Sequence, residues 1–315
     1  MLTVLVTEAI HPDALGYLRQ DMDAEAIEGW KLTPRQFAQA LPEADAILVR
    51  VSPIDRRMIE AATRLMVISK HGVGCDNIDA RCARERGIEI TVAADANTDS
   101  VAEHTLMFIL ALAKNLGLMD RALRRDYAER SKYRVVDVAG RNTLVLGYGR
   151  IGRKVAALCH AFAMDVTVHD PLLRMGETPE GFPVAASLDE ALEQTDILTL
   201  HLPLTPQTKG LMDRRRLRLL RPGAFVVNCA RGGIIDEGAL AELAASGHLG
   251  GVASDVFSVE PVESGNPLLG IDGALLTPHT AAFSEESMRR MGLRAARNIR
   301  DALAGALAPG MRFAG

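Results

Sequence analysis

The stretch Thr143-Leu144-Val145-Leu146-Gly147-Tyr148-Gly149-Arg150-Ile151-Gly152 decides the fold that we predict for this chain. Its first four residues predict a strand, and its last six fit the pattern G-x-G-x-x-G. That pattern alone is a weak signal, but here it follows a strand and opens a predicted helix over residues 153–162. The next predicted strand, 165–169, leads into Asp170, at roughly the 20-residue spacing of an acidic ribose ligand. The stretch therefore predicts a dinucleotide-binding α/β domain.

Each position of this pattern has a physical task. Gly147 permits the tight turn, Gly149 allows the backbone to approach a pyrophosphate, and Gly152 lets helix and strand pack closely. The helix N-terminus adds amide donors and a positive dipole for the phosphates. Asp170 can accept hydrogen bonds from both ribose hydroxyls and would repel a 2′-phosphate, which favours NAD over NADP. The alternative for Asp170 is a simple turn residue before Pro171.

Outward from this stretch, short β-branched runs alternate with amphipathic segments. The apolar runs are nearly continuous, as in parallel strands that are covered on both faces. We predict an α/β fold with two doubly wound parallel-sheet domains. The predicted strands span residues 4–6, 45–51, 65–69, 88–92, 143–146, 165–169, 196–200, 224–228, 251–255 and 274–277, and the predicted helices span residues 34–41, 55–62, 79–86, 100–115, 153–162 and 284–304.

Composition narrows the class of protein. The 315 residues carry a formal net charge of −4, which gives no overall attraction to nucleic acid or to an anionic membrane. The most apolar window, 105–113, is far shorter than the roughly 20 residues needed to cross a bilayer, and the N-terminus lacks the features of a signal peptide. Four cysteines without a C-x-x-C pair argue against a zinc site and against disulfides. We therefore expect a cytoplasmic protein without a metal.

Two segments are rich in basic residues. Residues 120–141 hold seven Arg or Lys, but interleaved acidic residues favour a solvated helix or a subunit arm over a nucleic-acid site. Residues 214–218 combine four arginines with a leucine, which is typical of the solvated face of a surface helix.

Three later segments bring chemistry to the carboxyl ends of predicted strands. Arg231 follows the strand 224–228, Glu260 follows the strand 251–255, and His279 follows the final strand. Ligands of open α/β sheets bind at that edge. An arginine, a carboxylate and a histidine there predict a hydride-transfer site.

With these segments the chain resembles the D-isomer-specific 2-hydroxyacid dehydrogenase family, which includes phosphoglycerate dehydrogenase and the glyoxylate/hydroxypyruvate reductases. The resemblance covers nearly the whole chain and includes KHGVGCDNID (residues 70–79), NTDSVAEH (97–104) and HLPLT (201–205). It implies an NAD-dependent oxidoreductase that transfers a hydride between the cofactor and C2 of a small 2-hydroxy or 2-keto acid.

The resemblance also implies the role of each catalytic residue. Arg231 would bind the substrate carboxylate, because a planar guanidinium suits bidentate recognition. His279 would act as general acid when a keto acid is reduced and as base in the reverse direction. Glu260 would pair with the imidazole and favour its charged form. Asp255 would contact the nicotinamide carboxamide.

The remaining groups follow from the same resemblance. The backbone of Val73 and Gly74 would hold the substrate carboxylate, with hinge motion closing over it. A Rossmann NAD-binding domain would span residues 98–284, and a discontinuous flavodoxin-like substrate domain would comprise residues 1–97 and 285–315. A homodimer would form through the NAD-binding domain, with residues 120–141 as its arm. Further cofactor contacts are implied for Arg150, Ile151, His201, Pro203 and Ala230.

The sequence leaves the substrate open. Arg50 and Lys70 suggest a second anionic group, so the candidates are acids of the phosphoglycerate, hydroxypyruvate, glyoxylate or sulfolactate type; the alternative is that both side chains are structural. Val51 stands where phosphoglycerate enzymes often have serine, and the chain ends near Gly315, so we expect no C-terminal regulatory domain.

Two other functions are disfavoured. The complete set of Arg231, Glu260 and His279 argues against an NAD(H)-binding corepressor-like dimeric scaffold with little turnover. Formate dehydrogenase shares the fold but typically has glutamine at the position of Glu260.

Overall fold

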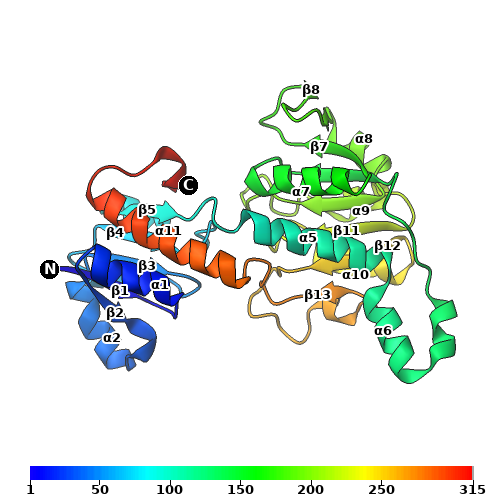
Figure 1. The fold of residues 1–315 in the computed structure, drawn as a ribbon. Coiled ribbons are helices and arrows are strands. Elements are labelled where there is room, and N and C mark those ends of the chain that lie inside the picture. Colours follow the sequence, from blue (N-terminus) through cyan, green and yellow to red (C-terminus); the bar gives the residue numbers. More distant parts are fainter. Residues whose placement is uncertain (314–315) are drawn as a thin grey trace. The chain divides into compact units, whose positions relative to one another are not determined.

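The computed structural model describes residues 1–313 as two compact units, each built around one sheet (Figure 1). Unit 1 comprises Met1–Asn97 and the chain from Phe283 onward, and unit 2 comprises Thr98–Ala282. The predicted α/β class with two parallel-sheet domains is confirmed. Within residues 1–313, every helix is too short or too polar to cross a membrane.

Unit 1 contains a parallel sheet in the order β2-β1-β3-β4-β5, which is the flavodoxin-like doubly wound order. Helices α2, α3 and α4 cover one face, and α1 and the long C-terminal α11 cover the other (Figure 1). Ile47 and Leu48 on β3 point to opposite faces and are both fully buried, and each stabilises the unit by about 1.5–3 kcal/mol. The strands are β1 (Leu2–Val6), β2 (Ala24–Glu28), β3 (Ala46–Val49), β4 (Val67–Lys70) and β5 (Glu89–Val92), and the helices are α1 (Pro12–Gly16), α2 (Pro34–Ala40), α3 (Arg56–Ala61), α4 (Ala80–Glu85) and α11 (Glu285–Leu303).

Unit 2 contains a sheet in the order β13-β12-β11-β10-β6-β7-β9-β8. From β9 to β12 this is the Rossmann order, with the topological switch point between β6 and β10. Helices α5 and α7 cover one face, and α8, α9 and α10 cover the other (Figure 1). The strands are β6 (Asn142–Leu146), β7 (Asp165–His169), β8 (Gly176–Glu177), β9 (Pro183–Val184), β10 (Ile197–Leu200), β11 (Ala224–Asn228), β12 (Leu249–Ser254) and β13 (Leu275–Leu276), and the helices are α5 (Thr98–Ala113), α6 (Leu116–Arg125), α7 (Arg150–Ala161), α8 (Leu188–Glu193), α9 (Arg214–Leu219) and α10 (Glu237–Ala245).

The sequence pattern does not predict β2 or the β8–β9 hairpin. β2 is an edge strand of alanine, glutamate and one isoleucine, and alanine and glutamate are poor strand formers. In the hairpin, β8 and β9 pair antiparallel through two residues each. Strands of this length are too short to show a hydrophobic period in the sequence.

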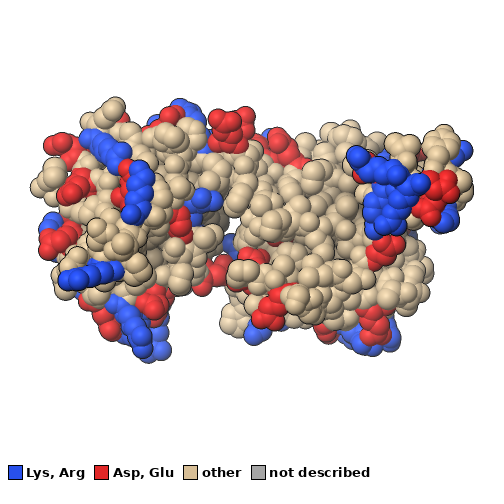
Figure 2. Space-filling model, turned by 90° about the horizontal axis from the view of Figure 1, so that it is seen from below, with Lys and Arg blue, Asp and Glu red and all other residues tan. Residues whose placement is uncertain are grey.

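The basic residues of α9 are paired with acids. Arg214 lies against Glu242, and Arg215 and Arg216 both bind Asp189. Hydrogen bonds from Arg215 and then Arg216 lower the pKa of Asp189 to about 2. On the face shown in Figure 2, Lys and Arg likewise lie among Asp and Glu. Such pairing is typical of a solvated surface and contributes little stability for each exposed pair.

Candidate active site

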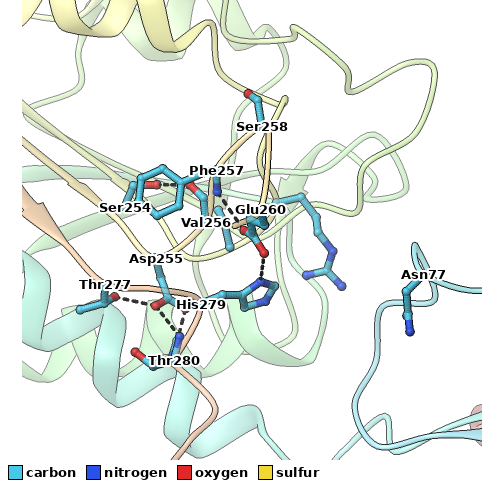
Figure 3. A network of polar contacts seen from close by, with 12 residues as sticks. Asn77, Ser254, Asp255, Val256, Phe257, Ser258, Glu260, Thr277, His279 and Thr280 are labelled. Carbon is cyan, nitrogen blue, oxygen red and sulfur yellow. Dashed lines mark hydrogen bonds and ion pairs between the residues drawn. The ribbon is translucent and has the colours of Figure 1, made fainter. Parts of the chain in front are cut away.

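His279 and Glu260 form an ion pair at the carboxyl edge of the unit 2 sheet (Figure 3). His279 Nδ1 lies 2.7 Å from Glu260 Oε2, and the Phe257 amide donates to Glu260 Oε1 at 3.0 Å. Burial alone would raise the pKa of Glu260, but the hydrogen bonds from His279 and Phe257, with the charge of Arg231, lower it overall. Because a carboxylate only accepts hydrogen bonds, Nδ1 of His279 must carry a proton. With Nδ1 protonated, Nε2 is the ring nitrogen that can gain or lose a proton.

The backbone around His279 is held by Asp255, whose side chain is 1% exposed. His279 has φ = 54°, a left-handed conformation that residues other than glycine rarely adopt. Asp255 Oδ1 accepts from the Thr280 amide at 2.7 Å and from the Thr277 hydroxyl at 2.5 Å (Figure 3). Oδ2 accepts from the Ala281 amide at 2.9 Å. The His279 amide donates to the Asp255 carbonyl at 2.8 Å. These contacts stabilise the turn that presents the imidazole.

Arg231 lies just beyond β11 and is half-buried. Asn228 braces its loop, because Nδ2 donates to the Arg231 carbonyl and Oδ1 accepts from the Ala230 amide, both at 3.0 Å. A Cβ on Gly232 would lie 1.9 Å from the Phe257 carbonyl oxygen, so only glycine allows this close approach. The loop of Arg231 therefore packs directly on the loop that carries Glu260.

The glycine loop has the geometry that a dinucleotide requires. Gly147 has φ = 95°, and a Cβ there would lie 2.5 Å from the His201 carbonyl oxygen. A Cβ on Gly152 would lie 2.0 Å from the Gly147 carbonyl oxygen. In contrast, within the described chain a Cβ on Gly149 meets nothing within 4 Å, and no side chain caps the N-terminus of α7 there. This space and these amides fit a pyrophosphate.

Asp170 follows β7 and is fixed by backbone donors. Its Oδ2 accepts from the Tyr148 amide at 2.8 Å and its Oδ1 from the Leu172 amide at 2.9 Å. Two amide donors orient the carboxylate beside the glycine loop, where each oxygen keeps a lone pair for a ribose hydroxyl. The α7 amides and the Asp170 carboxylate thus fit the phosphates and a ribose of a dinucleotide.

The other predicted cofactor residues lie around the same sheet edge. His201 directly follows β10, and burial lowers its pKa to about 3, so the side chain is neutral; Nε2 lies 2.9 Å from Thr199 Oγ1. Arg150 and Ile151 begin α7, Pro203 is exposed on the loop after β10, and Ala230 is buried beside Arg231.

In unit 1, the predicted substrate residues follow β3 and β4. Glu8 accepts hydrogen bonds from the amides of Arg50, Val51 and Ser52, which orders their loop. Arg50 Nη1 donates to the Ala9 carbonyl at 3.0 Å, and its guanidinium lies 5.4 Å from the centre of the Phe283 ring.

The end of β4 and the loop after it contain the other predicted contacts. The buried Lys70 donates to the Arg50 carbonyl and, at 2.5 Å, to Asn77 Oδ1, so it supports the Arg50 loop. Val73 is partly exposed on the same loop, next to Gly74. Sequence reasoning gave no role to Glu8, Asn77 or Thr277; the available signal for Glu8 was its position just beyond β1.

A dinucleotide loop on a Rossmann sheet, with arginine, glutamate and histidine at the same edge, is typical of a nicotinamide-dependent dehydrogenase. The chain belongs to the D-isomer specific 2-hydroxyacid dehydrogenase family, because residues 106–281 match the model of that family's NAD binding domain. This match gives the chain an NAD-binding domain.

Several known proteins are similar along the chain. D-3-phosphoglycerate dehydrogenase of Methanocaldococcus jannaschii is 37% identical over 98% of this chain, which spans 59% of that protein's length. The structure resembles the TT0316 protein from Thermus thermophilus with a TM-score of 0.86 and 31% identity, covering 99% of both chains. A glyoxylate reductase from Paecilomyes thermophila gives a TM-score of 0.86 at 28% identity, over 99% of this chain and 98% of that one.

Proposed function

We propose that this protein is an NAD-dependent oxidoreductase that interconverts a small 2-hydroxy acid and the corresponding 2-keto acid. The observation that carries the proposal is the 2.7 Å contact between His279 Nδ1 and Glu260 Oε2, at the sheet edge that also carries Arg231. Family membership and the dehydrogenase and reductase names of the relatives support an enzyme over a corepressor-like scaffold. When bound, NADH supplies a hydride to C2 of the keto acid, and NAD accepts one in the reverse direction.

Four side chains divide the remaining work. Arg231 binds the substrate carboxylate and orients C2. His279 delivers a proton from Nε2 to the C2 oxygen during reduction and takes it back during oxidation. Glu260 fixes the tautomer with the proton on Nδ1 and stabilises the imidazolium. Asp255 holds the turn of His279 and contacts the carboxamide of the cofactor.

For the substrate, we propose an acid with a second anionic group of the phosphoglycerate or sulfolactate type. Arg50 supports this proposal, because its guanidinium is held in place by Ala9 and Phe283. Lys70 adds positive charge and fixes the Arg50 carbonyl. The simpler acids glyoxylate and hydroxypyruvate are the alternative if Arg50 and Lys70 act only in the structure.

The test is NADH oxidation, followed by absorbance, with glyoxylate, hydroxypyruvate, phosphohydroxypyruvate, sulfopyruvate and 2-oxoglutarate. His279→Ala should lower kcat at least about 100-fold on every substrate that is turned over. Arg50→Ala should reduce kcat/KM selectively for the dianionic substrates. If the protein binds NADH but turns over none of these keto acids, the proposed function is contradicted. If Arg50→Ala leaves the substrate preference unchanged, the proposal that the substrate carries a second anionic group is contradicted.

We also propose that the protein forms a homodimer through residues 120–141 and the part of α6 that precedes them. Leu116 and Leu123 on α6 and Tyr127 beyond it are each more than half exposed, which is unusual for so many large apolar side chains on one short segment. Light scattering after gel filtration should give a dimer mass for the wild type and a lower mass for Leu123→Glu; a monomeric wild type would contradict the proposal.

A further inference from the structure

His104, on α5, has no role in the proposed reaction, but it contacts the network that holds His279. Its Nε2 lies 3.1 Å from Thr277 Oγ1 and 3.9 Å from Asp255 Oδ1. The ring packs edge-on against Phe108, with centroids 4.5 Å apart and an interplanar angle of 77°. The side chain of His104 is 16% exposed, so the orientation of the ring is set by these neighbours.

The direction of the hydrogen bonds can be deduced from the single proton of the Thr277 hydroxyl. Asp255 Oδ1 lies 2.5 Å from Thr277 Oγ1, and a carboxylate only accepts, so the hydroxyl donates to Asp255. In its contact with His104, Thr277 Oγ1 must therefore accept, and His104 must donate from Nε2. Burial lowers the pKa of His104 against the opposing charge of Asp255, so this donor is the neutral imidazole with its proton on Nε2.

We propose that His104 is a positioning residue for His279 that acts through Thr277 and Asp255. The inference rests on the proposed role of His279 as the proton carrier. The His104 donor orients the Thr277 hydroxyl, and that hydroxyl shares Asp255 Oδ1 with the Thr280 amide. A buried carboxylate oxygen that loses a hydrogen-bond donor is destabilised, so the Asp255 side chain is held less firmly and the turn that depends on it loosens. The left-handed backbone of His279 persists only while its surroundings determine it.

The direct test is amide hydrogen exchange of Thr280 and Ala281, measured by NMR on the cofactor-free protein. Thr277→Val removes the hydroxyl and keeps the shape, so both amides should exchange about tenfold faster. Thr277→Ser restores the hydroxyl and should exchange like the wild type. Equal exchange in Thr277→Val and the wild type, or equal exchange in Thr277→Ser and Thr277→Val, would overturn the inference.

A second histidine, which is exposed where His104 is largely buried, controls for loss of an edge-on ring contact. His160, on α7, packs edge-on against Phe182 at 5.7 Å and 75°, and within residues 1–313 no carboxylate relay contacts it. His104→Phe should accelerate exchange at Thr280 and Ala281 and lower kcat for keto acid reduction about tenfold, whereas His160→Phe should change neither. Equal effects of the two substitutions would overturn the inference.

A double-mutant cycle separates the relay from independent defects. If His104 acts through Thr277, the double variant His104→Phe/Thr277→Val should exchange no faster than either single variant. Additive acceleration would overturn the inference. If the wild type reduces no keto acid, the proposed function fails, while the exchange measurements still decide whether the relay exists.

Discussion

Glu260→Gln is expected to move the pH–rate profile of keto acid reduction to lower pH. In the proposed reaction, reduction requires a protonated His279, so activity should be present at low pH and lost as pH rises through the inflection. Glu260 is a carboxylate at neutral pH because its hydrogen bonds with His279 and Phe257 lower its pKa against the effect of burial. Glutamine keeps the shape of the side chain without its negative charge, so the imidazolium is less stable and the inflection moves to lower pH. Oxidation of the hydroxy acid, which requires the neutral imidazole, should gain activity over the same lower range.

The size of this shift follows from the geometry. A hydrogen bond to a charged group contributes about 1.5–3 kcal/mol when buried, and an exposed ion pair contributes less than about 1 kcal/mol. His279 and Glu260 are 50% and 36% exposed and lie 2.7 Å apart, so we expect an intermediate value of about 1.4 kcal/mol, or about one pH unit.

The assay is kcat/KM for the best keto acid between pH 5 and 10, with Glu263→Gln as control. Glu263 is exposed on the same loop, and its substitution should leave the profile in place. A Glu260→Gln profile that loses height without moving would refute the reasoning, because Glu260 would then not set the proton affinity of the site.

Three further predictions concern the glycines and the buried histidine. Gly149→Ala should change the free energy of unfolding by no more than about 1 kcal/mol, because a Cβ there meets nothing within 4 Å in the described chain. The same substitution should weaken NADH binding at least about tenfold in a fluorescence titration. An unchanged Kd would show that no pyrophosphate approaches Gly149. Gly232→Ala should lower stability by about 2 kcal/mol or more in urea unfolding, because its Cβ would lie 1.9 Å from the Phe257 carbonyl oxygen, and wild-type stability would contradict that contact. Burial lowers the pKa of His201 to about 3, so between that pH and its ordinary pKa near 6.5 the histidine gains a proton on unfolding. The free energy of unfolding should therefore fall as pH falls through this window, by about 1.4 kcal/mol per pH unit. His201→Gln should flatten the dependence of unfolding free energy on pH between about pH 5 and 6.5, and equal slopes in the two proteins would contradict a buried neutral histidine.

The sequence predicts the sheets well where strands are central and apolar. The predicted strand 224–228 coincides with β11, and 165–169 coincides with β7. β11 is covered by helices on both faces, so burial produces the continuous apolar run from which it is recognised. β7 is recognised instead from its alternation, because only Val166 and Val168 point into the core. β2 lacks that run because it lies at the sheet edge and leaves most of its residues partly exposed.

The candidate site is less accessible to sequence reasoning than the fold. Strand order places Arg231, Glu260 and His279 at one edge, because parallel strands share the end at which ligands bind. The contacts that orient these side chains join distant residues, such as His104 and Thr277, which are 173 positions apart. Such pairs leave no periodicity, since each depends on how a loop turns after its strand.

In the proposed reaction, the packing of the unit 2 loops keeps the spacing of the catalytic side chains fixed. In every 2-hydroxy acid the carboxylate is bonded to the reacting carbon, so Arg231 and His279 must keep a fixed separation whatever the rest of the substrate is. The structure meets this requirement by contact: Gly232 packs on the Phe257 carbonyl, and the Phe257 amide donates to Glu260. The loop of Arg231 therefore cannot shift without moving the partner of the imidazole. The Arg50 loop is ordered separately within unit 1, where Glu8 accepts hydrogen bonds from the Arg50 and Val51 amides.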